Sequence, residues 1–202
     1  MPTAKNLVRS VREQIADTLR SEVLSGVWSN DAPMRESMLA ERFGVSRGPI
    51  RDALLQLSQE GVLVYWPNKG VRVNVPLDEA EQQMLQSMRR EMEVFCLKRS
   101  FDTLTEADDE QLEGILDDLS RACERGNLSA VADSDLALHR FLVRRASPAL
   151  EAVWLSITSR VLMTYSRINR FDEIVAEHTA IVQAVRERNL VAAQNALNTN
   201  II

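Results

Sequence analysis

The chain has 202 residues, of which 45% are hydrophobic and 26% charged, a composition typical of a globular protein. Its apolar stretches are shorter than the roughly 18 residues that a membrane span requires, and the N-terminus lacks the apolar core of a signal peptide, so we expect a cytoplasmic protein. Two cysteines, Cys96 and Cys123, exclude a disulfide framework and a cysteine-based zinc site, and we expect both to be small buried side chains. Seven glycines and six prolines are too few for a turn-rich all-β fold, so the composition indicates helices.

Charge is distributed unevenly along the chain, whose net charge is −5. Residues 1–76 contain ten Lys and Arg against eight Asp and Glu, whereas residues 77–202 contain fourteen against twenty-one. A slightly basic head on an acidic body is compatible with a DNA-binding module joined to another kind of domain. A difference of this size also arises by chance, so it needs the support of specific motifs.

Three helices are predicted before residue 60. Over residues 7–24, apolar side chains recur at three- and four-residue steps, as on one face of an amphipathic helix. A short helix is expected at 36–43, followed by a tight turn at 44–46. Ser46 is well placed to cap a third helix, which continues to about Glu60.

After Gly61 the hydrophobic period changes from that of a helix to that of a strand. Apolar residues alternate over 62–66 and over 71–75, and the segment PNKG at 67–70 between them is typical of a turn. This pattern indicates a two-stranded hairpin of the kind called a wing.

The remainder of the sequence contains no strand signal, and six helices are expected there. Their ranges are 78–101, 105–125, 128–146, 148–170, 172–188 and 190–202. We therefore predict a mainly α protein with two domains: a winged helix-turn-helix DNA-binding domain at 1–76 and an antiparallel all-helical bundle at 77–202. The larger aromatic side chains of the bundle are expected in its core. They are Phe95, Phe141, Trp154 and Tyr165.

The third helix carries the residues expected to read DNA, because a helix-turn-helix places this helix in the major groove. Arg47 and Arg51 lie four residues apart on the face opposite the apolar stripe. Bidentate contact between arginine and guanine is the commonest base-specific contact. The Ser46 hydroxyl and the helix N-terminus offer a phosphate site, and Lys69 and Gly70 at the wing tip can enter the minor groove. An isolated arginine pair would more simply be a solvated helix face, but the complete motif favours DNA binding.

The stretch from Leu39 to Gly61 reads LAERFGVSRGPIRDALLQLSQEG. It resembles the GntR family of bacterial transcription regulators, whose signature includes LA-x-x-x-GVSR-x-P-[VI]-R-[ED]-AL-x-x-L-x-x-x-G. The resemblance implies that Arg47 and Arg51 contact bases and that Gly70 approaches the minor groove. Arg35 precedes the second helix and is expected to contact phosphate. Some family members carry an arginine where Ser37 stands, so one of their base contacts is expected to be absent here.

Both histidines of the chain lie in its acidic half. Asp135 and His139 are four residues apart on one helical face, a chelating geometry for a divalent cation, and His178 follows on a later helix. A hydrogen-bonded surface pair is the simpler reading of this spacing taken alone.

Residues 77–202 are similar to the FCD effector domain, the C-terminal domain of one GntR subfamily. Its pattern is R-x-x-[LM]-E, then D-x-x-x-H, then E-H, and a last histidine twenty-two positions later. The matching residues are Arg89, Met92, Glu93, Asp135, His139, Glu177 and His178. The resemblance implies that the aspartate and the histidines hold Zn²⁺, Ni²⁺ or a similar ion at the bottom of a pocket, where a small carboxylate effector completes the coordination.

The sequence departs from this pattern at Asn200, which stands where the last histidine is expected. An amide oxygen suits zinc or nickel less well than an imidazole does. Either three protein ligands hold the ion and leave positions open for water or effector, or the pocket is without metal and Asn200 hydrogen-bonds the effector. The sequence stops at Ile202, so either the domain is trimmed relative to its family or the sequence is not full length.

Arg89 is the best candidate partner for an effector carboxylate, because a guanidinium group binds a carboxylate through two parallel hydrogen bonds. A structural ion pair with Glu93 or with an acid on another helix is an equally good reading of the same residue.

These patterns predict a bacterial DNA-binding transcription regulator and not an enzyme. We expect a repressor that binds a palindromic operator as a homodimer. The resemblance implies that a small organic acid releases it, because the effector changes the orientation of the two DNA-binding heads. The alternatives are a metal-dependent hydrolase that uses Asp135, His139 and His178, and a regulator that no longer senses an effector. Against the hydrolase, the sequence has no second carboxylate pair, no nucleophile motif and no glycine-rich phosphate loop.

Overall fold

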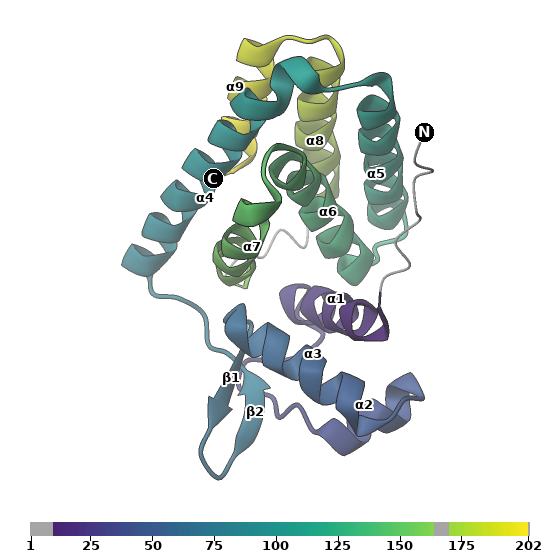
Figure 1. The fold of residues 1–202 in the computed structure, drawn as a ribbon, viewed down its shortest axis with the longest axis vertical. Helices are drawn as coiled ribbons and strands as arrows, with labels where there is room; N and C mark the ends of the chain where they lie inside the picture. Colours follow the sequence, from purple (N-terminus) through teal and green to yellow (C-terminus); the bar gives the residue numbers. More distant parts are fainter. Residues whose placement is uncertain (1–9, 164–169, 202) are drawn as a thin grey trace.

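The computed structural model describes residues 10–163 and 170–201. The elements of the N-terminal part are α1 (Val11–Leu24), α2 (Glu36–Phe43), α3 (Arg47–Gln59), β1 (Leu63–Trp66) and β2 (Gly70–Val73). Those that follow are α4 (Glu79–Ser100), the short 3₁₀ helix η1 (Phe101–Thr103), α5 (Glu106–Glu124), α6 (Leu128–Ala146), α7 (Pro148–Leu162), α8 (Phe171–Arg186) and α9 (Leu190–Asn200). Figure 1 shows a small head made of α1 to α3 and the hairpin, joined by the irregular segment 74–78 to a bundle made of α4 to α9. The predicted mainly α fold with a two-stranded wing is confirmed.

The element boundaries agree with the sequence pattern to within a few residues where the structure describes them. α1 ends at Leu24 as expected, and the first part of the predicted helix, residues 7–9, lies outside the described residues. The predicted helix at 148–170 ends earlier, at Leu162, and residues 164–169 of it lie outside the described part. No helix in the described segments is both long enough and apolar enough to cross a membrane.

The head is held together by an apolar core between α1, α3 and the wing. Leu19, Leu39, Ile50 and Leu57 are fully buried in it. Between α2 and α3 the chain turns at Gly44, whose φ of 65° lies in the left-handed region that favours glycine. This turn joins α2 to α3 as the tight turn of the helix-turn-helix that the sequence predicts.

The wing is an antiparallel hairpin in which Leu63 pairs with Val73 and Trp66 with Gly70. The loop before α2 runs along β2 of the wing, where Met34 N donates to Val71 O at 2.9 Å. This pairing holds the start of α2 against the wing, so these two segments lie on the same side of the head.

The bundle packs its helices around leucine, isoleucine and valine side chains. Leu97, Leu138, Leu142, Ile181 and Val185 are each fully buried in one cluster to which α4, α6 and α8 contribute. Apolar burial of this kind is the main contribution to stability.

Three of the four predicted aromatic placements lie within the described residues. Phe141 is partly buried and packs against the apolar cluster of the bundle. Trp154 is fully buried, as expected. Phe95 is not in the core: its side chain is 52% exposed, because it lies on the outer face of α4, so that prediction was wrong. Tyr165 lies outside the described residues. Cys96 and Cys123 are free and buried, as predicted.

Helix α7 contacts the head directly. Ser156 Oγ donates to Glu60 O at 3.3 Å, and Arg160 donates to the carbonyl oxygens of Gly61 at 3.3 Å and Val75 at 2.9 Å. Gly61 has a φ of +75°, and a Cβ there would lie 2.9 Å from Cδ of Arg160. The head therefore docks on α7 at a point that requires glycine for both its backbone conformation and its space.

Candidate nucleic-acid interface and metal centre

Helix α3 presents the two predicted base-reading arginines to solvent. Its apolar face is buried at Ile50, Leu54 and Leu57, so Arg47 and Arg51 point away from the head. Ser46 is the N-cap residue, but its side chain makes no capping hydrogen bond. Ser46 therefore stands at the predicted N-cap position without the capping hydrogen bond, and its hydroxyl lies at a helix N-terminus of the kind that binds phosphate.

Arg35, Arg47, Lys69 and Gly70 line one groove between α2, α3 and the wing, with a volume of about 510 Å³. The wing turns back at Gly70, whose φ is 74°. Four basic side chains line the groove, Arg35, Arg47, Lys69 and Arg72, together with one carboxylate, that of Glu36. Basic side chains gathered from distant parts of the sequence are suited to contact a phosphate backbone.

Arg51 lies beside this groove and is paired with Glu36, the first residue of α2. Arg51 Nε and Nη2 donate to the two carboxylate oxygens of Glu36, each at 3.1 Å. The hydrogen bonds from Arg51, together with its charge and that of Arg47, lower the pKa of Glu36. The pair fixes the direction of the guanidinium group and places a negative charge at the edge of the interface.

In the bundle, Asp135 and His139 on α6 meet His178 on α8. One ligand atom from each of these three side chains lies within 4.8 Å of the others. The four-residue spacing on α6 puts Asp135 and His139 on one face of the helix, as predicted. Both histidines are fully buried, and the Asp135 side chain is 18% exposed.

Both imidazoles are oriented through Nδ1. His139 Nδ1 lies 2.5 Å from Oε2 of Glu93, and His178 Nδ1 lies 2.7 Å from the carbonyl oxygen of Ile174. A carbonyl oxygen can only accept, so Nδ1 of His178 carries a proton and donates it. Nε2 of each ring is therefore left for the side of the ring that faces the Asp135 cluster. Metal-binding histidines are commonly oriented in this way, by a hydrogen bond at the ring nitrogen that does not bind the metal.

Glu93 is a fully buried carboxylate that receives hydrogen bonds from three helices. Its oxygens accept from Arg89 Nε at 2.8 Å, from Trp154 Nε1 at 2.7 Å and from His139. Burial alone would raise the pKa of Glu93, but the charges of His139 and Arg89 and their hydrogen bonds lower it to about 2. Glu93 is therefore ionised and fixes the ring of His139.

The donor set fits a divalent cation. Nε2 of His139 is buried and has no hydrogen-bond partner among the described residues. Nε2 of His178 lies 3.0 Å from Oδ1 of Asp135, and in the neutral ring these two atoms are both acceptors, so either a proton or a cation must lie between them. Burial alone would raise the pKa of Asp135, but the hydrogen bond and charge of His178, with the charges of His139 and Arg89, lower it. Two imidazoles and one carboxylate form a ligand set used by zinc sites.

The two candidate effector residues have protein partners. Arg89 forms the ion pair with Glu93 that the sequence offered as one of two readings, and it lies close enough to Asp135 for its charge to act there. Asn200 is buried at the end of α9, and its Nδ2 donates to Oε2 of Glu177 at 3.0 Å.

Several residues of these sites were not singled out from the sequence, among them Glu36 and Arg72 of the groove. Trp154 was placed in the core without a role, although its indole N–H binds Glu93. Tyr65 lines the groove of the head from the exposed face of the wing, and only its outward position in an alternating strand could have drawn attention to it.

Comparison with known families divides the chain at the same place as the fold. Residues 11–73 match the model of the bacterial regulatory proteins of the gntR family, and residues 84–201 match the FCD domain. The family comprises transcription regulators and not enzymes, so the hydrolase alternative is not supported.

Several regulators are similar over nearly the whole chain. The HTH-type transcriptional repressor RspR of Escherichia coli is 24% identical over 98% of this chain and 89% of its own length. The gluconate operon transcriptional repressor of Bacillus licheniformis is 24% identical over 93% of this chain and 80% of its own length. Among solved structures, McbR/YncC of E. coli superposes with a TM-score of 0.77 at 18% identity, covering 96% of this chain and 94% of that one. The chain thus belongs to the GntR family of bacterial regulatory proteins, carries an FCD domain, and is a DNA-binding transcription regulator.

Proposed function

We propose that the protein is a repressor that binds a palindromic operator as a homodimer. Helix α3 enters the major groove, where Arg47 and Arg51 contact base edges, while Lys69 and Gly70 of the wing approach the adjacent minor groove. Arg35 and Ser46 bind phosphates. The observation that carries this proposal is the single groove lined by Arg35, Arg47, Lys69 and Gly70 beside Arg51.

The two domains have different functions. Residues 1–76 bind DNA, and residues 77–202 form the homodimer and bind the effector. One recognition helix reads only a few base pairs, so pairing two heads raises specificity into a useful range. The role of repressor is supported by the names of several relatives, such as the probable D-xylose utilization operon repressor of Paenarthrobacter nicotinovorans, 25% identical over 98% of this chain and 89% of its own length. We place the protein in the cytoplasm, where it meets bacterial DNA.

In the FCD domain, Asp135, His139 and His178 would hold a divalent metal ion, zinc or nickel, beside which a small organic acid would bind. The metal supplies a positive charge to which the carboxylate of the acid binds. Arg89 contributes a second positive charge near the same place, and Asn200 contributes an amide at its border. The gluconate operon repressor is a relative whose name contains an acid of this chemical class.

DNA recognition is tested with an operator selected in vitro from random double-stranded DNA. We expect a selected sequence with twofold symmetry. Arg47→Ala and Arg51→Ala should each lower the preference for this operator over random DNA by about 5- to 150-fold, which corresponds to 1–3 kcal/mol per lost arginine–guanine contact, at constant salt. The matched control is Arg121→Ala, which removes an exposed arginine of α5 and should change nothing. A variant of α3 that keeps the wild-type preference would refute the recognition role.

Effector binding is tested by a thermal-shift screen of small carboxylates, with Zn²⁺, with Ni²⁺ and with a chelator. We expect at least one acid to raise the melting temperature in the presence of metal, because a ligand that binds the folded state stabilises it. His139→Gln should abolish this increase. If no acid stabilises the wild-type protein in any condition, the protein does not sense a carboxylate and acts constitutively.

A further inference from the structure

Helix α6 carries the metal-site residues Asp135 and His139, and within the same two turns it contacts the DNA-binding head. Asp133 Oδ1 accepts from Ser21 of α1 at 3.1 Å, and Nη1 of Arg140 lies 3.7 Å from Oδ1 of Asp17. In Figure 1, α1 lies between α6 of the bundle and α3 of the head. The helix that holds two of the three candidate metal ligands is therefore also a surface on which the head rests.

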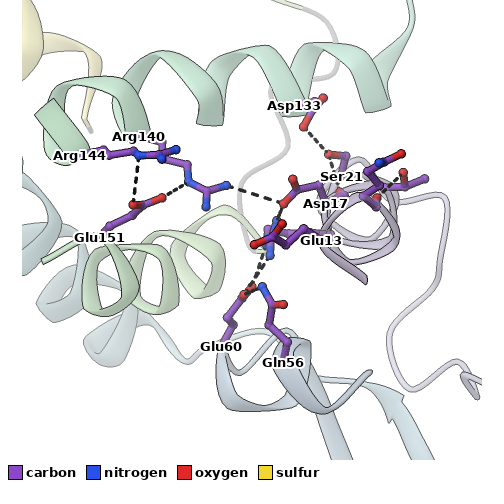
Figure 2. A network of polar contacts seen from close by, with 12 residues as sticks. Glu13, Asp17, Ser21, Gln56, Glu60, Asp133, Arg140, Arg144 and Glu151 are labelled. Atoms are coloured by element: carbon purple, nitrogen blue, oxygen red, sulfur yellow. Dashed lines mark hydrogen bonds and ion pairs between the residues drawn. The ribbon is translucent and has the colours of Figure 1, made fainter. Parts of the chain in front are cut away.

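From Arg140, ionised side chains of alternating sign continue to the end of the recognition helix (Figure 2). Asp17 accepts from Nη1 of Arg20 at 2.5 Å, and Nε and Nη2 of Arg20 donate to the carboxylate of Glu60 at 2.8 and 2.9 Å. Glu60 is the C-cap residue of α3. Arg20 and Glu60 are buried, so this part of the row is rigid. The row thus joins α6, α1 and α3 through direct contacts.

Arg140 is the most exposed member of this row, with 29% of its side chain exposed, and it contacts carboxylates from two different parts of the molecule. Its Nε donates to Oε1 of Glu151 on α7 at 2.5 Å, whereas the contact with Asp17 on α1 is longer, at 3.7 Å. A small rotation or shift of α6 would strengthen one contact at the expense of the other. Arg140 lies one residue beyond His139, so any movement of α6 that accompanies metal binding changes the position of Arg140 as well.

We propose that Arg140 is a positioning residue that transmits occupancy of the metal site to the recognition helix, through Asp17, Arg20 and Glu60. The proposal rests on the proposed function, in which ligands of the bundle change the affinity of the head for DNA. Loss of the Arg140 guanidinium leaves the head attached, because α7 still binds it through Ser156 and Arg160. We therefore expect the substitution to change the coupling between the metal site and the head and to leave the fold intact.

The test compares Arg140→Met with Arg144→Met. Methionine retains much of the apolar stem and removes the guanidinium group. Arg144 lies one turn further along α6 and approaches Glu151 at 3.8 Å but, unlike Arg140, forms no ion pair with α1 among the described residues. Asp17→Asn removes the negative charge of the α1 partner of Arg140. Each variant is measured for Zn²⁺ affinity by calorimetry, for melting temperature, and for affinity to the selected operator with Zn²⁺ or with a chelator.

We expect Zn²⁺ to change the operator affinity of the wild-type protein and of Arg144→Met by about 5- to 150-fold. Arg140→Met and Asp17→Asn should bind Zn²⁺ with wild-type affinity, yet their operator affinity should no longer respond to it. A purely structural role would not separate these two measurements.

Four results would overturn the inference. In the first, the operator affinity of Arg140→Met responds to Zn²⁺ as that of the wild type does; in the second, Arg140→Met no longer binds Zn²⁺. In the third, Arg140→Met and Arg144→Met both lose the response of operator affinity to Zn²⁺. Each of these three results leaves the proposed function intact. A wild-type protein whose operator affinity ignores Zn²⁺ would remove metal control of the head, and the inference with it. If Arg140→Met does not fold, Asp17→Asn decides between these outcomes in the same way.

Discussion

Glu93→Gln is the substitution that bears most directly on the buried centre of the bundle. The carboxylate accepts hydrogen bonds from Arg89 and Trp154 on Oε1 and from His139 on Oε2. In the glutamine variant, the amide oxygen can still accept from Arg89 and Trp154. The amide nitrogen then faces Nδ1 of His139 and donates to it, which moves the imidazole proton to Nε2. The variant thus leaves a buried guanidinium without its anion and turns a metal-binding lone pair into an N–H.

The expected loss of stability follows from burial of the pair, since the Arg89 and Glu93 side chains are 6% and 0% exposed. Removing one partner of a buried ion pair costs about 3–5 kcal/mol. For a chain of this length, this corresponds to a fall in melting temperature of about 6–20 °C. Loss of a carboxylate that orients a metal-binding histidine lowers metal affinity by about 10- to 100-fold.

The assay is thermal unfolding at neutral pH, followed by circular dichroism, together with calorimetric titration of Zn²⁺. Glu91→Gln is the matched control, because Glu91 is exposed on the same helix and its substitution should change stability by less than about 0.5 kcal/mol. If Glu93→Gln melts within about 2 °C of the wild type and binds Zn²⁺ with unchanged affinity, Glu93 does not hold this centre together.

Three further predictions concern the head and its contacts. Glu36→Gln removes a negative charge from the DNA face and releases its arginine partner on α3, so it should raise the affinity for random DNA and steepen the dependence of log K on log salt by about one, measured by fluorescence anisotropy. Gly61→Ala should cost about 1 kcal/mol or more beyond Gly126→Ala in denaturant unfolding: both glycines have positive φ, but only at Gly61 would the new Cβ lie 2.9 Å from the side chain of Arg160. Hydrogen bonds from Arg42 of α2 lower the pKa of Glu22 below its ordinary value of 4.5. The stability difference between wild type and Glu22→Gln should therefore be constant above about pH 5 and shrink as the pH falls below 4.5.

The head could be predicted from the sequence because its signals are local. The turn at Gly44, the apolar stripe of α3 and the alternation of the wing depend on residues close together in the chain, and each lies where the pattern places it. The placement of Asp135 and His139 on one face of α6 was predictable for the same reason, since four residues make about one turn of a helix.

The remainder depends on contacts between distant segments, which spacing does not encode. Glu93 meets His139 and Trp154 across three helices, and Arg20 meets Glu60 from forty residues away. Phe95 was misplaced for a related reason: an apolar residue on a helix predicts burial only when its face is known, and the face of α4 that carries Phe95 is exposed.

The most direct test of metal and acid control of the head is the affinity of the wild-type protein for its selected operator. It is measured at constant salt in the presence of Zn²⁺, with and without the carboxylate that gives the largest thermal shift. We expect the acid to weaken operator binding by about 5- to 150-fold, and His139→Gln to remove this effect while it still binds the operator. An acid that stabilises the protein but leaves its operator affinity unchanged would contradict the account.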